Sequence, residues 1–335
     1  MEKILIIPIL LSFFITLFTL PIWIRKAKKA GICGKNINRL DRKEVAEAGG
    51  IIVLFSFIFG ILFYIAIKTF VLKTDVTTIE IFALIMTIFI AGIIGFIDDI
   101  IEWKIGLSAK VRIILLFFAA IPLMVVNAGE STMMGINFGL IYPLIFIPLG
   151  VIGASATYNF LAGYNGLEAS QGILILSTFS ILNYYQNNSW LSLVCLCMVA
   201  CLIAFYIFNK YPTKIFPGNV LTYSVGALIA SVAILGNIEK IAVFFFIPYI
   251  IETGLKVRGK LKKQSFAKVE EDGSLSIPYE KFYSLTHISI YLIKALKKKM
   301  GKEERVYETE VVYFVNLFQI LIIFLGLILF KNPLF

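Results

Sequence analysis

The chain has 335 residues, of which 59% are hydrophobic and 16% charged, and its mean hydropathy is +0.90. Ordinary soluble domains are about 45–50% apolar, so this composition excludes a typical soluble enzyme. The net charge of +10, in so apolar a chain, indicates membrane orientation and no nucleic-acid partner. The sequence therefore predicts an all-α, polytopic integral membrane protein.

A helix that crosses a bilayer needs roughly 20 mostly apolar residues. Runs of this kind predict about ten transmembrane helices, near residues 4–24, 48–68, 79–97, 111–127, 138–158, 172–186, 190–208, 219–236, 240–257 and 311–331. The first run has no small-residue cleavage site after it, so we expect it to stay as the first span. The whole chain, 1–335, is expected to form a single transmembrane catalytic domain.

The distribution of lysine and arginine predicts the topology. The alternate segments 25–47, 98–112, 159–171, 209–218 and 256–310 hold 26 of the 31 basic residues. Basic loops stay in the cytoplasm, so we expect these five segments inside and both termini outside. The outward loops are short, which places the active site on the cytoplasmic face of a multi-pass protein of the cell membrane.

The largest inward segment, 256–310, is expected to form a cytoplasmic loop with a short hairpin and an amphipathic helix. Residues 270–274 (EEDGS) have the composition of a hairpin turn. Residues 287–300 place apolar side chains on one helix face and four lysines elsewhere, which predicts a helix that lies on the anionic inner leaflet. His287, the only histidine of the chain, is expected on the surface of that helix.

Two adjacent carboxylates, Asp98 and Asp99, end the third predicted span. Ionisable groups at membrane depth are costly and mark function by default, and acids at a helix C-terminus oppose the helix dipole. Adjacent helical residues point about 100° apart, so one aspartate can face a ligand while the other orients it or a metal. Lys110, eleven residues after Asp99 at the start of the fourth span, suits a phosphate or is a snorkelling anchor.

An inward loop at 159–171 (NFLAGYNGLEASQ) has no basic residue and is rich in amides and glycine. Glycine lets the backbone approach a ligand, and asparagine offers both a donor and an acceptor. The loop therefore indicates a site for a nucleotide base or a metal-bound oxygen. A second candidate, 211–219 (YPTKIFPGN), is a rigid turn before the eighth span, although a plain proline-glycine turn explains it equally well.

The four cysteines show no disulfide spacing. Cys195, Cys197 and Cys201 lie in one apolar run, and we expect buried thiols there. Cys197 and Cys201 are one helical turn apart, but no further cysteine or histidine accompanies them, which disfavours a metal site.

In this order and spacing, the motifs resemble those of the polyprenyl-phosphate N-acetylhexosamine-1-phosphate transferases. The eukaryotic and archaeal branch, which acts on UDP-N-acetylglucosamine (UDP-GlcNAc) and dolichyl phosphate, fits best. The resemblance rests on CGKNIN at 33–38 with Glu47, the paired aspartates, the 159–171 loop, the 211–219 turn and GSLSIPYEKF at 273–282. It implies transfer of GlcNAc-1-phosphate from UDP-GlcNAc to a polyisoprenyl phosphate with release of UMP, as the first step of lipid-linked oligosaccharide synthesis for N-glycosylation. Mg²⁺, or alternatively Mn²⁺, is the implied cofactor. The resemblance is compatible with a homodimer as well as a monomer.

The resemblance also implies a role for each matched position. Asn159, Asn219 and Asp99 would hold the metal, and Asp98, Asp99 and Lys110 would be catalytic. The substrate-binding set comprises residues matched to the nucleotide, sugar and phosphate contacts: Lys35, Ile37, Asn38, Glu47, Asn165, Glu168, Lys262, Lys263 and Lys268.

Three positions depart from the family pattern. Asn219 stands where the family usually has an aspartate that ligates Mg²⁺, and an amide supplies an oxygen without the charge. Ala156 replaces an asparagine of the eukaryotic branch. The loop after Arg258 carries lysines where that branch has an Arg-His-Arg cluster, and lysine lacks the bidentate fork of arginine.

Three other functions compete with this one. A related enzyme could take another UDP-N-acetylhexosamine for cell-wall or surface polysaccharide, but bacterial members of that kind have a histidine-rich inward loop that this chain lacks. A multi-pass transporter would carry its carboxylates near the bilayer midplane, whereas here they lie near the predicted interface. A structural membrane protein would keep its function when either aspartate is changed to asparagine.

Overall fold

The computed structural model describes residues 3–74, 77–101, 106–133 and 136–330, and it has a helix over every predicted apolar run. The end of the last predicted run, residue 331, and the extreme termini lie outside the described residues. The helices of the bundle are α1 (Ile6–Lys29), α2 (Gly50–Ala66), α3 (Thr78–Ile101), α4 (Ala109–Val125), α5 (Ile147–Phe160), α6 (Leu167–Tyr185), α7 (Ser189–Asn209), α8 (Gly218–Leu235), α9 (Glu239–Phe245), α10 (Ile247–Arg258) and α12 (Glu308–Leu329). Two π-helical turns, Ile67–Leu72 and Tyr142–Phe146, extend α2 and precede α5.

Among the described residues, seven helices are long and apolar enough to cross a membrane, which confirms a polytopic protein while falling short of ten spans. They are Ile6–Lys29, Gly50–Leu72, Thr78–Ile101, Tyr142–Phe160, Ser189–Asn209, Gly218–Leu235 and Glu308–Leu329. Each of the other three predicted runs lacks a helix of this length and apolarity for a physical reason. Helix α4 has only 17 residues, α6 buries polar side chains such as Glu168 and Asn183, and the 240–257 run breaks at Phe246 before Pro248, whose ring removes a helical N–H.

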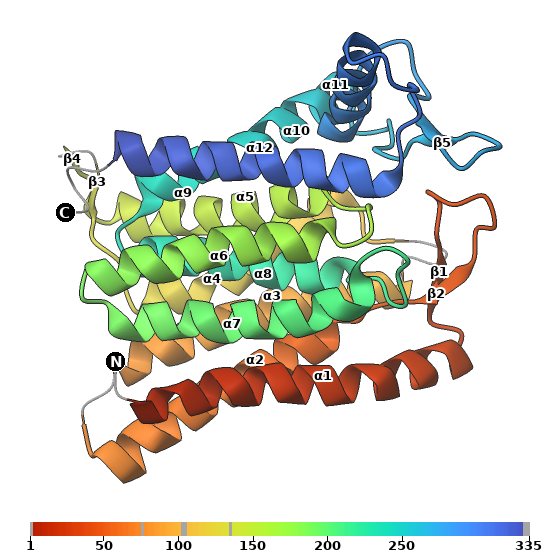
Figure 1. Cartoon of the computed structure of the whole chain (residues 1–335). Helices are drawn as coiled ribbons and strands as arrows, with labels where there is room; N and C mark the ends of the chain where they lie inside the picture. Colours follow the sequence, from red (N-terminus) through yellow and green to blue (C-terminus); the bar gives the residue numbers. More distant parts are fainter. Residues whose placement is uncertain (1–2, 75–76, 102–105, 134–135, 331–335) are drawn as a thin grey trace.

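Helix α8 lies at the centre of the bundle, packed against α3 on one side and α5 on the other. Nearly all of its side chains are buried. Helices α6 and α7 pack together, and α7 also contacts α1 and α2. Figure 1 shows that α1 begins and α12 ends at the same end of the bundle. The termini of the described chain therefore share one side.

Three two-stranded antiparallel sheets join the described helices. They are β1 (Cys33–Lys35) with β2 (Glu44–Ala46), β3 (Thr132–Met133) with β4 (Ile136–Asn137), and β5 (Lys268–Val269) with β6 (Leu275–Ser276). The third sheet confirms the predicted hairpin, with Gly273 in its turn at φ +79°. Strands β1, β2 and β5 lie at one end of the bundle, and β3 and β4 lie at the other (Figure 1).

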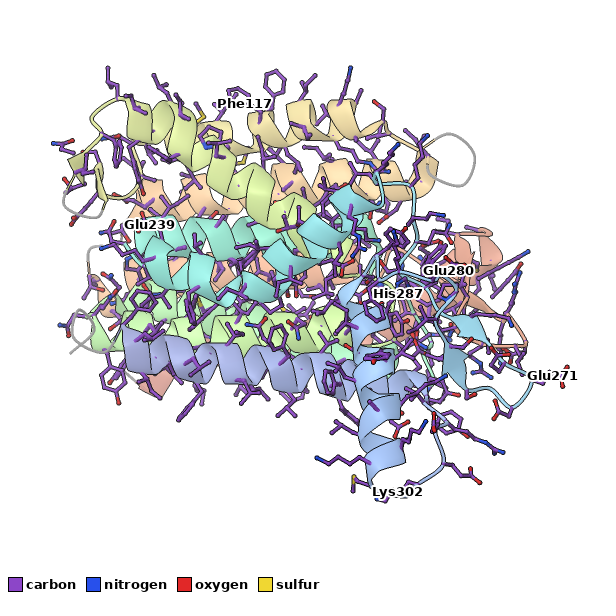
Figure 2. All side chains as sticks on the ribbon, turned by 90° about the horizontal axis from the view of Figure 1, so that it is seen from above. Phe117, Glu239, Glu271, Glu280, His287 and Lys302 are labelled. Carbon is purple, nitrogen blue, oxygen red and sulfur yellow. The ribbon has the colours of Figure 1, made fainter. Side chains whose placement is uncertain are left out.

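Helix α11 (Leu285–Lys299) runs across the end of the bundle and projects beyond it toward Lys302 (Figure 2). Its predicted apolar stripe is present, because Tyr291, Leu292 and Leu296 are exposed. The expectation of a surface histidine is wrong: His287 is fully buried. It lies in the first turn of α11, a helix that packs against α10 and α12.

The cysteines are free, and Cys195, Cys197 and Cys201 are buried as predicted.

Candidate active site

A cavity of about 380 Å³ lies at the end of the bundle where β1 is found. It is bordered by β1, the end of α3, the loop after α5, the start of α8 and Phe266. Eight of the predicted residues line it: Lys35, Ile37, Glu47, Asp99, Asn159, Asn165, Glu168 and Asn219. The structure thus brings together motifs that are spread over 185 positions of the sequence, from Lys35 to Asn219.

Two glycines allow α3 and α8 to meet closely at this cavity. A Cβ on Gly95 would lie 2.4 Å from the carbonyl oxygen of Asn219, and a Cβ on Gly218 would lie 2.2 Å from Oδ2 of Asp99. Gly218 also has φ +71°, in the left-handed region. Only glycine at both positions therefore lets Asp99 approach the first turn of α8.

Asp99 accepts hydrogen bonds from that turn. The backbone N–H of Asn219 donates to Oδ1 at 2.6 Å, and the N–H of Val220 donates to Oδ2 at 3.2 Å. A helix N-terminus has unpaired donors and a partial positive charge, so it stabilises the carboxylate as an anion. Asp99 is 9% exposed and borders the cavity, so its carboxylate forms part of the cavity wall.

Asp98 has a different environment from its neighbour. It is fully buried, and Nε of Arg112 lies 2.9 Å from its Oδ2. The N–H of Leu107 donates to its Oδ1 at 3.0 Å, and Nδ2 of Asn219 donates to its Oδ2 at 3.1 Å. Asp98 does not border the cavity, so the structure makes it the residue that orients Asn219 beside Asp99.

Asp98 pairs with Arg112, which is not among the predicted residues, while Lys110, the predicted phosphate contact, lies elsewhere. Lys110 is exposed and does not line the cavity. Both side chains begin in the first turn of α4. Arginine favours close pairing with carboxylates because its guanidinium matches their geometry, and this preference is the signal that favours Arg112.

Three oxygen-bearing side chains converge on the cavity from α3, α5 and α8: Asp99, Asn159 and Asn219. The hydroxyl of Thr222 donates to Oδ1 of Asn159 at 3.0 Å and so holds this oxygen in place. Carboxylate and amide oxygens suit Mg²⁺, which keeps several waters and uses few protein ligands. The donor set therefore fits a hard divalent cation, with Asp99 as its one charged member.

The loop between α5 and α6 is folded around Glu168. The N–H of Gly163 donates to Oε1 of Glu168 at 2.7 Å, and the hydroxyl of Tyr158 donates to the Glu168 carbonyl at 2.5 Å. Gly163 has φ +115°, and a Cβ there would lie 2.9 Å from the ring of Phe266. Among the described residues, Oε2 of Glu168 and Oδ1 of Asn209 are buried without a hydrogen-bond partner, and both side chains line the cavity. Bound ligand hydroxyl or amide donors would satisfy them.

Glu308, the first residue of α12, is a second residue that sequence reasoning missed. Its Oε1 accepts the backbone N–H of Asn165 at 2.8 Å and Nδ2 of Asn38 at 3.2 Å. Its Oε2 accepts Nδ2 of Asn165 at 3.0 Å. Asn38 therefore contacts the site through Glu308 and is absent from the cavity wall.

The β1 segment and Glu47 form the rim of the cavity. Nε1 of Trp23 donates to the carbonyl of Glu47 at 3.0 Å, and a Cβ on Gly34 would lie 3.0 Å from Oε2 of Glu47. Burial, followed by the charge of Glu44, raises the pKa of the Cys33 thiol above its usual value. Cys33 is thus a neutral thiol and no nucleophile at neutral pH.

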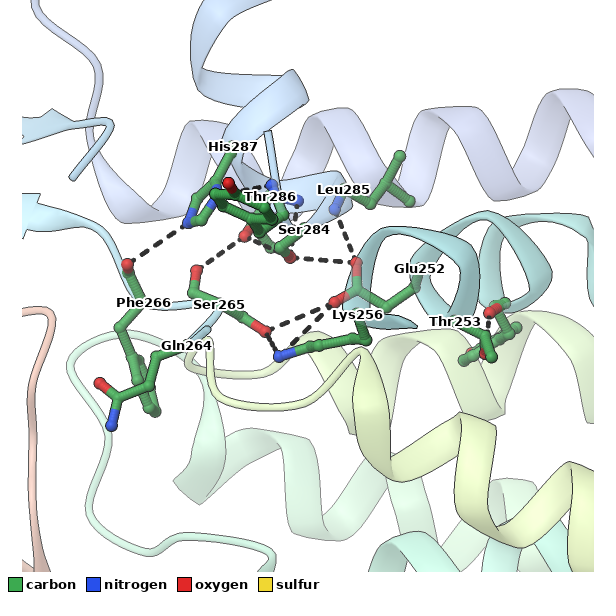
Figure 3. Close-up of polar contacts among 12 residues, drawn as sticks. Glu252, Thr253, Lys256, Gln264, Ser265, Phe266, Ser284, Leu285, Thr286 and His287 are labelled. Carbon is green, nitrogen blue, oxygen red and sulfur yellow. Dashed lines mark hydrogen bonds and ion pairs between the residues drawn. The ribbon is translucent and has the colours of Figure 1, made fainter. Parts of the chain in front are cut away.

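A buried polar network fixes the segment that carries Phe266 (Figure 3). Glu252 of α10 accepts the N–H of Leu285 at 2.6 Å and the hydroxyl of Ser284 at 3.0 Å, and Lys256 contacts Ser265. Glu252 therefore ties the start of α11 to the loop beside the cavity.

His287 belongs to the same network and is held in one tautomer. Its Nδ1 accepts the N–H of Tyr283 at 3.4 Å, which leaves Nε2–H to donate to the Phe266 carbonyl, also at 3.4 Å. Burial lowers the pKa of His287 below its ordinary value of 6.5, and Lys256 lowers it further. The imidazole is neutral and supports the cavity wall from behind.

The three predicted lysines of the last inward loop lie away from the cavity wall. Nζ of Lys263 lies 4.7 Å from the ring centroid of Tyr279, and Lys268 pairs with Glu270 at 3.5 Å. Lys262 is exposed. The structure therefore does not bring Lys262, Lys263 or Lys268 to the site; Tyr279 and Glu270 hold two of them elsewhere.

A second cavity, of about 370 Å³, is an apolar groove between α5, α8, α9 and α10. The hydroxyl of Tyr142 donates to Glu239 at one end of it, and Figure 2 places Glu239 at the opposite end of the bundle from His287. Thr157 lines the groove and is two residues before Asn159 on α5. The groove thus runs along the helix that carries a residue of the polar cavity.

The structure thus combines a helical bundle of the membrane-spanning type with a polar, acid-lined cavity at one end and an apolar groove along α5, the architecture of an integral membrane protein with a polar site. The family described as Glycosyl transferase family 4 matches residues 81–237. The chain is 38% identical over 291 residues, 84% of this chain and 87% of the relative, to a protein of Saccharolobus solfataricus named as a UDP-N-acetylglucosamine--dolichyl-phosphate N-acetylglucosaminephosphotransferase. The chain belongs to glycosyl transferase family 4.

Two further relatives show the breadth of the family. A Sulfolobus acidocaldarius protein with the same name is 30% identical over 290 residues, 84% of this chain and 86% of the relative. A phospho-N-acetylmuramoyl-pentapeptide-transferase of Halalkalibacterium halodurans is 27% identical over 288 residues, 78% of this chain and 86% of the relative.

Proposed function

We propose that the protein transfers GlcNAc-1-phosphate from UDP-GlcNAc to a polyisoprenyl phosphate of the dolichyl type, releasing UMP. The product, a GlcNAc-diphospho-lipid, would be the first intermediate of lipid-linked oligosaccharide synthesis for protein N-glycosylation. The names of the two archaeal relatives support this activity. The main observation in its support is that Asp99, Asn159, Asn165 and Asn219 line the same cavity.

The charge of the cavity supports a divalent cation. Among the described residues of the wall, the acidic Glu47, Asp99 and Glu168 face one lysine, Lys35. Burial raises the pKa of Glu168 to about 7, so Glu47 and Asp99 supply most of the negative charge. A nucleotide diphosphate carries several negative charges, so this wall would repel it unless a cation is bound. Asp99, Asn159 and Asn219 would hold Mg²⁺, or Mn²⁺ in its place, and the cation would neutralise phosphate charge during transfer.

The reaction itself requires mainly positioning. A phosphate oxygen of the lipid forms a bond to the β-phosphorus of UDP-GlcNAc, the bond from that phosphorus to the bridging oxygen breaks, and UMP leaves with the electron pair. Asp99 would orient the lipid phosphate and accept its proton. Lys35 of β1 also lines the cavity, and its positive charge would offset phosphate charge.

The apolar groove supports a lipid acceptor. Its wall consists almost entirely of apolar side chains, and α5 connects it to Asn159. An isoprenoid chain lying along α5 would place its phosphate near the end of that helix. The groove thus fits the lipidic substrate, and the polar cavity fits the nucleotide sugar.

The orientation that we propose has ten spans, termini outside and the cavity on the cytoplasmic face. The basic segments 25–47 and 256–310 lie at the cavity end of the bundle, where the positive-inside rule places the cytoplasm. The exposed apolar stripe of α11 would then rest on the inner leaflet, with Lys298 and Lys299 near anionic headgroups.

One assay distinguishes two alternative functions from this proposal. The donor could be another UDP-N-acetylhexosamine, such as UDP-GalNAc, which differs from UDP-GlcNAc in the orientation of one hydroxyl. The lysines expected to contact the sugar do not line the cavity. A transporter is disfavoured by family membership, and it would move label across vesicles without forming a new lipid.

The test is to incubate the purified chain with polyprenyl phosphate, Mg²⁺ and UDP-GlcNAc labelled in the sugar. We expect organic-soluble label together with an equal amount of UMP. Release of UDP would mean a glycosyl transfer and contradict the proposal. Absence of product across a panel of UDP-sugars and lipid phosphates would also contradict it.

A further inference from the structure

Glu308 determines which atoms of Asn165 are free to meet a ligand. The Glu308 carboxylate accepts both the backbone N–H and Nδ2 of Asn165. Because both carboxylate oxygens accept hydrogen bonds from Asn165, the amide nitrogen of Asn165 points toward Glu308 and its Oδ1 points away. The contact with Glu308 therefore fixes the orientation of this amide.

The freed oxygen belongs to a residue of the cavity wall. Asn165 lines the cavity, and within the described part of the chain no hydrogen bond to its Oδ1 is found. This side chain is 6% exposed, so little water competes for the oxygen. A ligand group that meets Oδ1 has to be a hydrogen-bond donor, because two acceptors would leave it unpaired.

The third partner of Glu308 strengthens this arrangement. Nδ2 of Asn38 donates to Oε1 of Glu308 and also to the carbonyl of Gly163 at 3.1 Å. Three N–H groups thus converge on one buried carboxyl group, and these hydrogen bonds oppose the cost of burying its charge. Glu308 is 143 residues from Asn165 in sequence, so α12 supplies a fixed reference for the loop between α5 and α6.

We propose that Glu308 is a positioning residue that makes the site selective for the base of the nucleotide. The inference rests on the proposed function, in which the donor is a uridine nucleotide. Uracil carries N3–H, a donor that matches the Asn165 oxygen, whereas cytosine has an unprotonated acceptor at N3. Glu308 favours uracil by holding the Asn165 amide in the orientation that accepts.

The substitution Glu308→Gln tests this inference because it replaces the acceptor carboxylate by an amide that can also donate. The Asn165 amide is then free to turn and present its nitrogen to the cavity. We would measure binding of UMP and CMP to the purified full chain by calorimetry, with Mg²⁺ present. We expect the preference for UMP over CMP to fall roughly tenfold or more, the effect of one matched hydrogen bond. Glu310→Gln is the matched control, since Glu310 lies in the same first turn but pairs with Lys297; its UMP preference should stay unchanged.

A second variant separates selectivity from loss of structure. In Asn165→Asp combined with Glu308→Gln, the new amide donates to the new carboxylate, which keeps an oxygen toward the cavity and preserves the net charge. We expect this double variant to regain most of the UMP preference. Equal weakening of UMP and CMP by Glu308→Gln, or failure of the double variant to regain selectivity, would overturn the inference.

The outcomes separate this inference from the proposed transferase. If the wild type prefers UMP, Glu308→Gln loses that preference and yet no lipid product forms, the transferase proposal fails and the role of Glu308 stands. If the lipid product forms but the wild type binds UMP and CMP equally, the role of Glu308 is wrong.

Discussion

Arg112 and Asp98 form an ion pair across the start of α4 and the end of α3, with Nε 2.9 Å from Oδ2. The carboxylate is fully buried and the guanidinium side chain is 28% exposed. Removing one partner of such a pair leaves an uncompensated buried charge, whereas removing both does not.

We therefore expect Arg112→Leu to lower the free energy of unfolding by about 3 kcal/mol, visible as a reduced Tm. The double variant Arg112→Leu with Asp98→Asn should recover much of that loss. Thermal unfolding of the purified variants measures both. A double variant as unstable as Arg112→Leu would show that the pair has no specific role.

The amide of Asn219 should determine the Mg²⁺ concentration that activity requires. Its replacement Asn219→Asp adds a carboxylate to the proposed cation site, so we expect half-maximal activity at a lower Mg²⁺ concentration. The new carboxylate would also lie beside Asp98, which now accepts Nδ2 of Asn219, and like charges repel. The same variant should therefore be less stable than wild type without Mg²⁺, and more strongly stabilised by adding it. An unchanged Mg²⁺ titration would remove Asn219 from the metal site.

Gly95 should be intolerant of a side chain. In Gly95→Ala the new Cβ would lie 2.4 Å from the Asn219 carbonyl, so α3 and α8 must separate and Asp99 must lose its backbone partners. We expect at least a tenfold fall in kcat and a lower Tm. Gly254→Ala on α10 is the matched control, because a Cβ there meets nothing within 4 Å and alanine favours a helix by about 1 kcal/mol over glycine. Full activity of Gly95→Ala would contradict the close-packing argument.

The buried imidazole of His287 should make stability depend on pH. Its folded-state pKa lies below 6.5, mainly because of burial. Between that lowered pKa and the ordinary one, the unfolded chain binds a proton that the folded chain does not. The free energy of unfolding should therefore fall as the pH drops through and below about 6.5.

The measurement is the Tm of wild type and His287→Gln at pH 7.5 and pH 5. We expect the variant to show a smaller fall in Tm over this interval, although its Tm at pH 7.5 is itself lower. An equal fall in both proteins would assign the pH dependence to other groups.

The apolar groove should affect binding of the lipid substrate and not binding of the nucleotide sugar. Gly153 lines it, and a Cβ at this position meets nothing within 4 Å. Gly153→Leu fills this space, so we expect a higher KM for long-chain polyprenyl phosphate with little change in the KM for UDP-GlcNAc. A short-chain lipid phosphate serves as the comparison substrate. A parallel rise of both KM values would mean that the substitution disturbs the fold.

Much of the site was predictable because its motifs are local. Asp99, Asn159 and Asn219 stand at the ends of apolar runs, where polar residues are unexpected, and the structure joins them in one cavity. Arg112 and Glu308 could not be found in this way. Their importance depends on which helix ends meet, and Glu308 contacts a loop that lies more than a hundred residues earlier.

The predictions for the lysines of the last inward loop and for His287 were wrong for a related reason. A lysine-rich loop indicates which side of the membrane it occupies, but composition does not tell where its side chains point. Tyr279 and Glu270 hold Lys263 and Lys268 away from the cavity. Periodicity likewise identified the exposed apolar stripe of α11 but did not show that the loop carrying Phe266 buries the first turn of this helix, where His287 lies.

The position of Asp99 limits how this protein can change. One carboxylate both anchors the first turn of the central helix and borders the candidate active site, so we expect a substitution there to alter folding and turnover together. The pair of Asp98 and Arg112 is coupled to the same region, because Asp98 also accepts Nδ2 of Asn219. Efforts to stabilise the enzyme or to change its donor should therefore spare Asp99 and Asp98 and begin at the Glu308 contact.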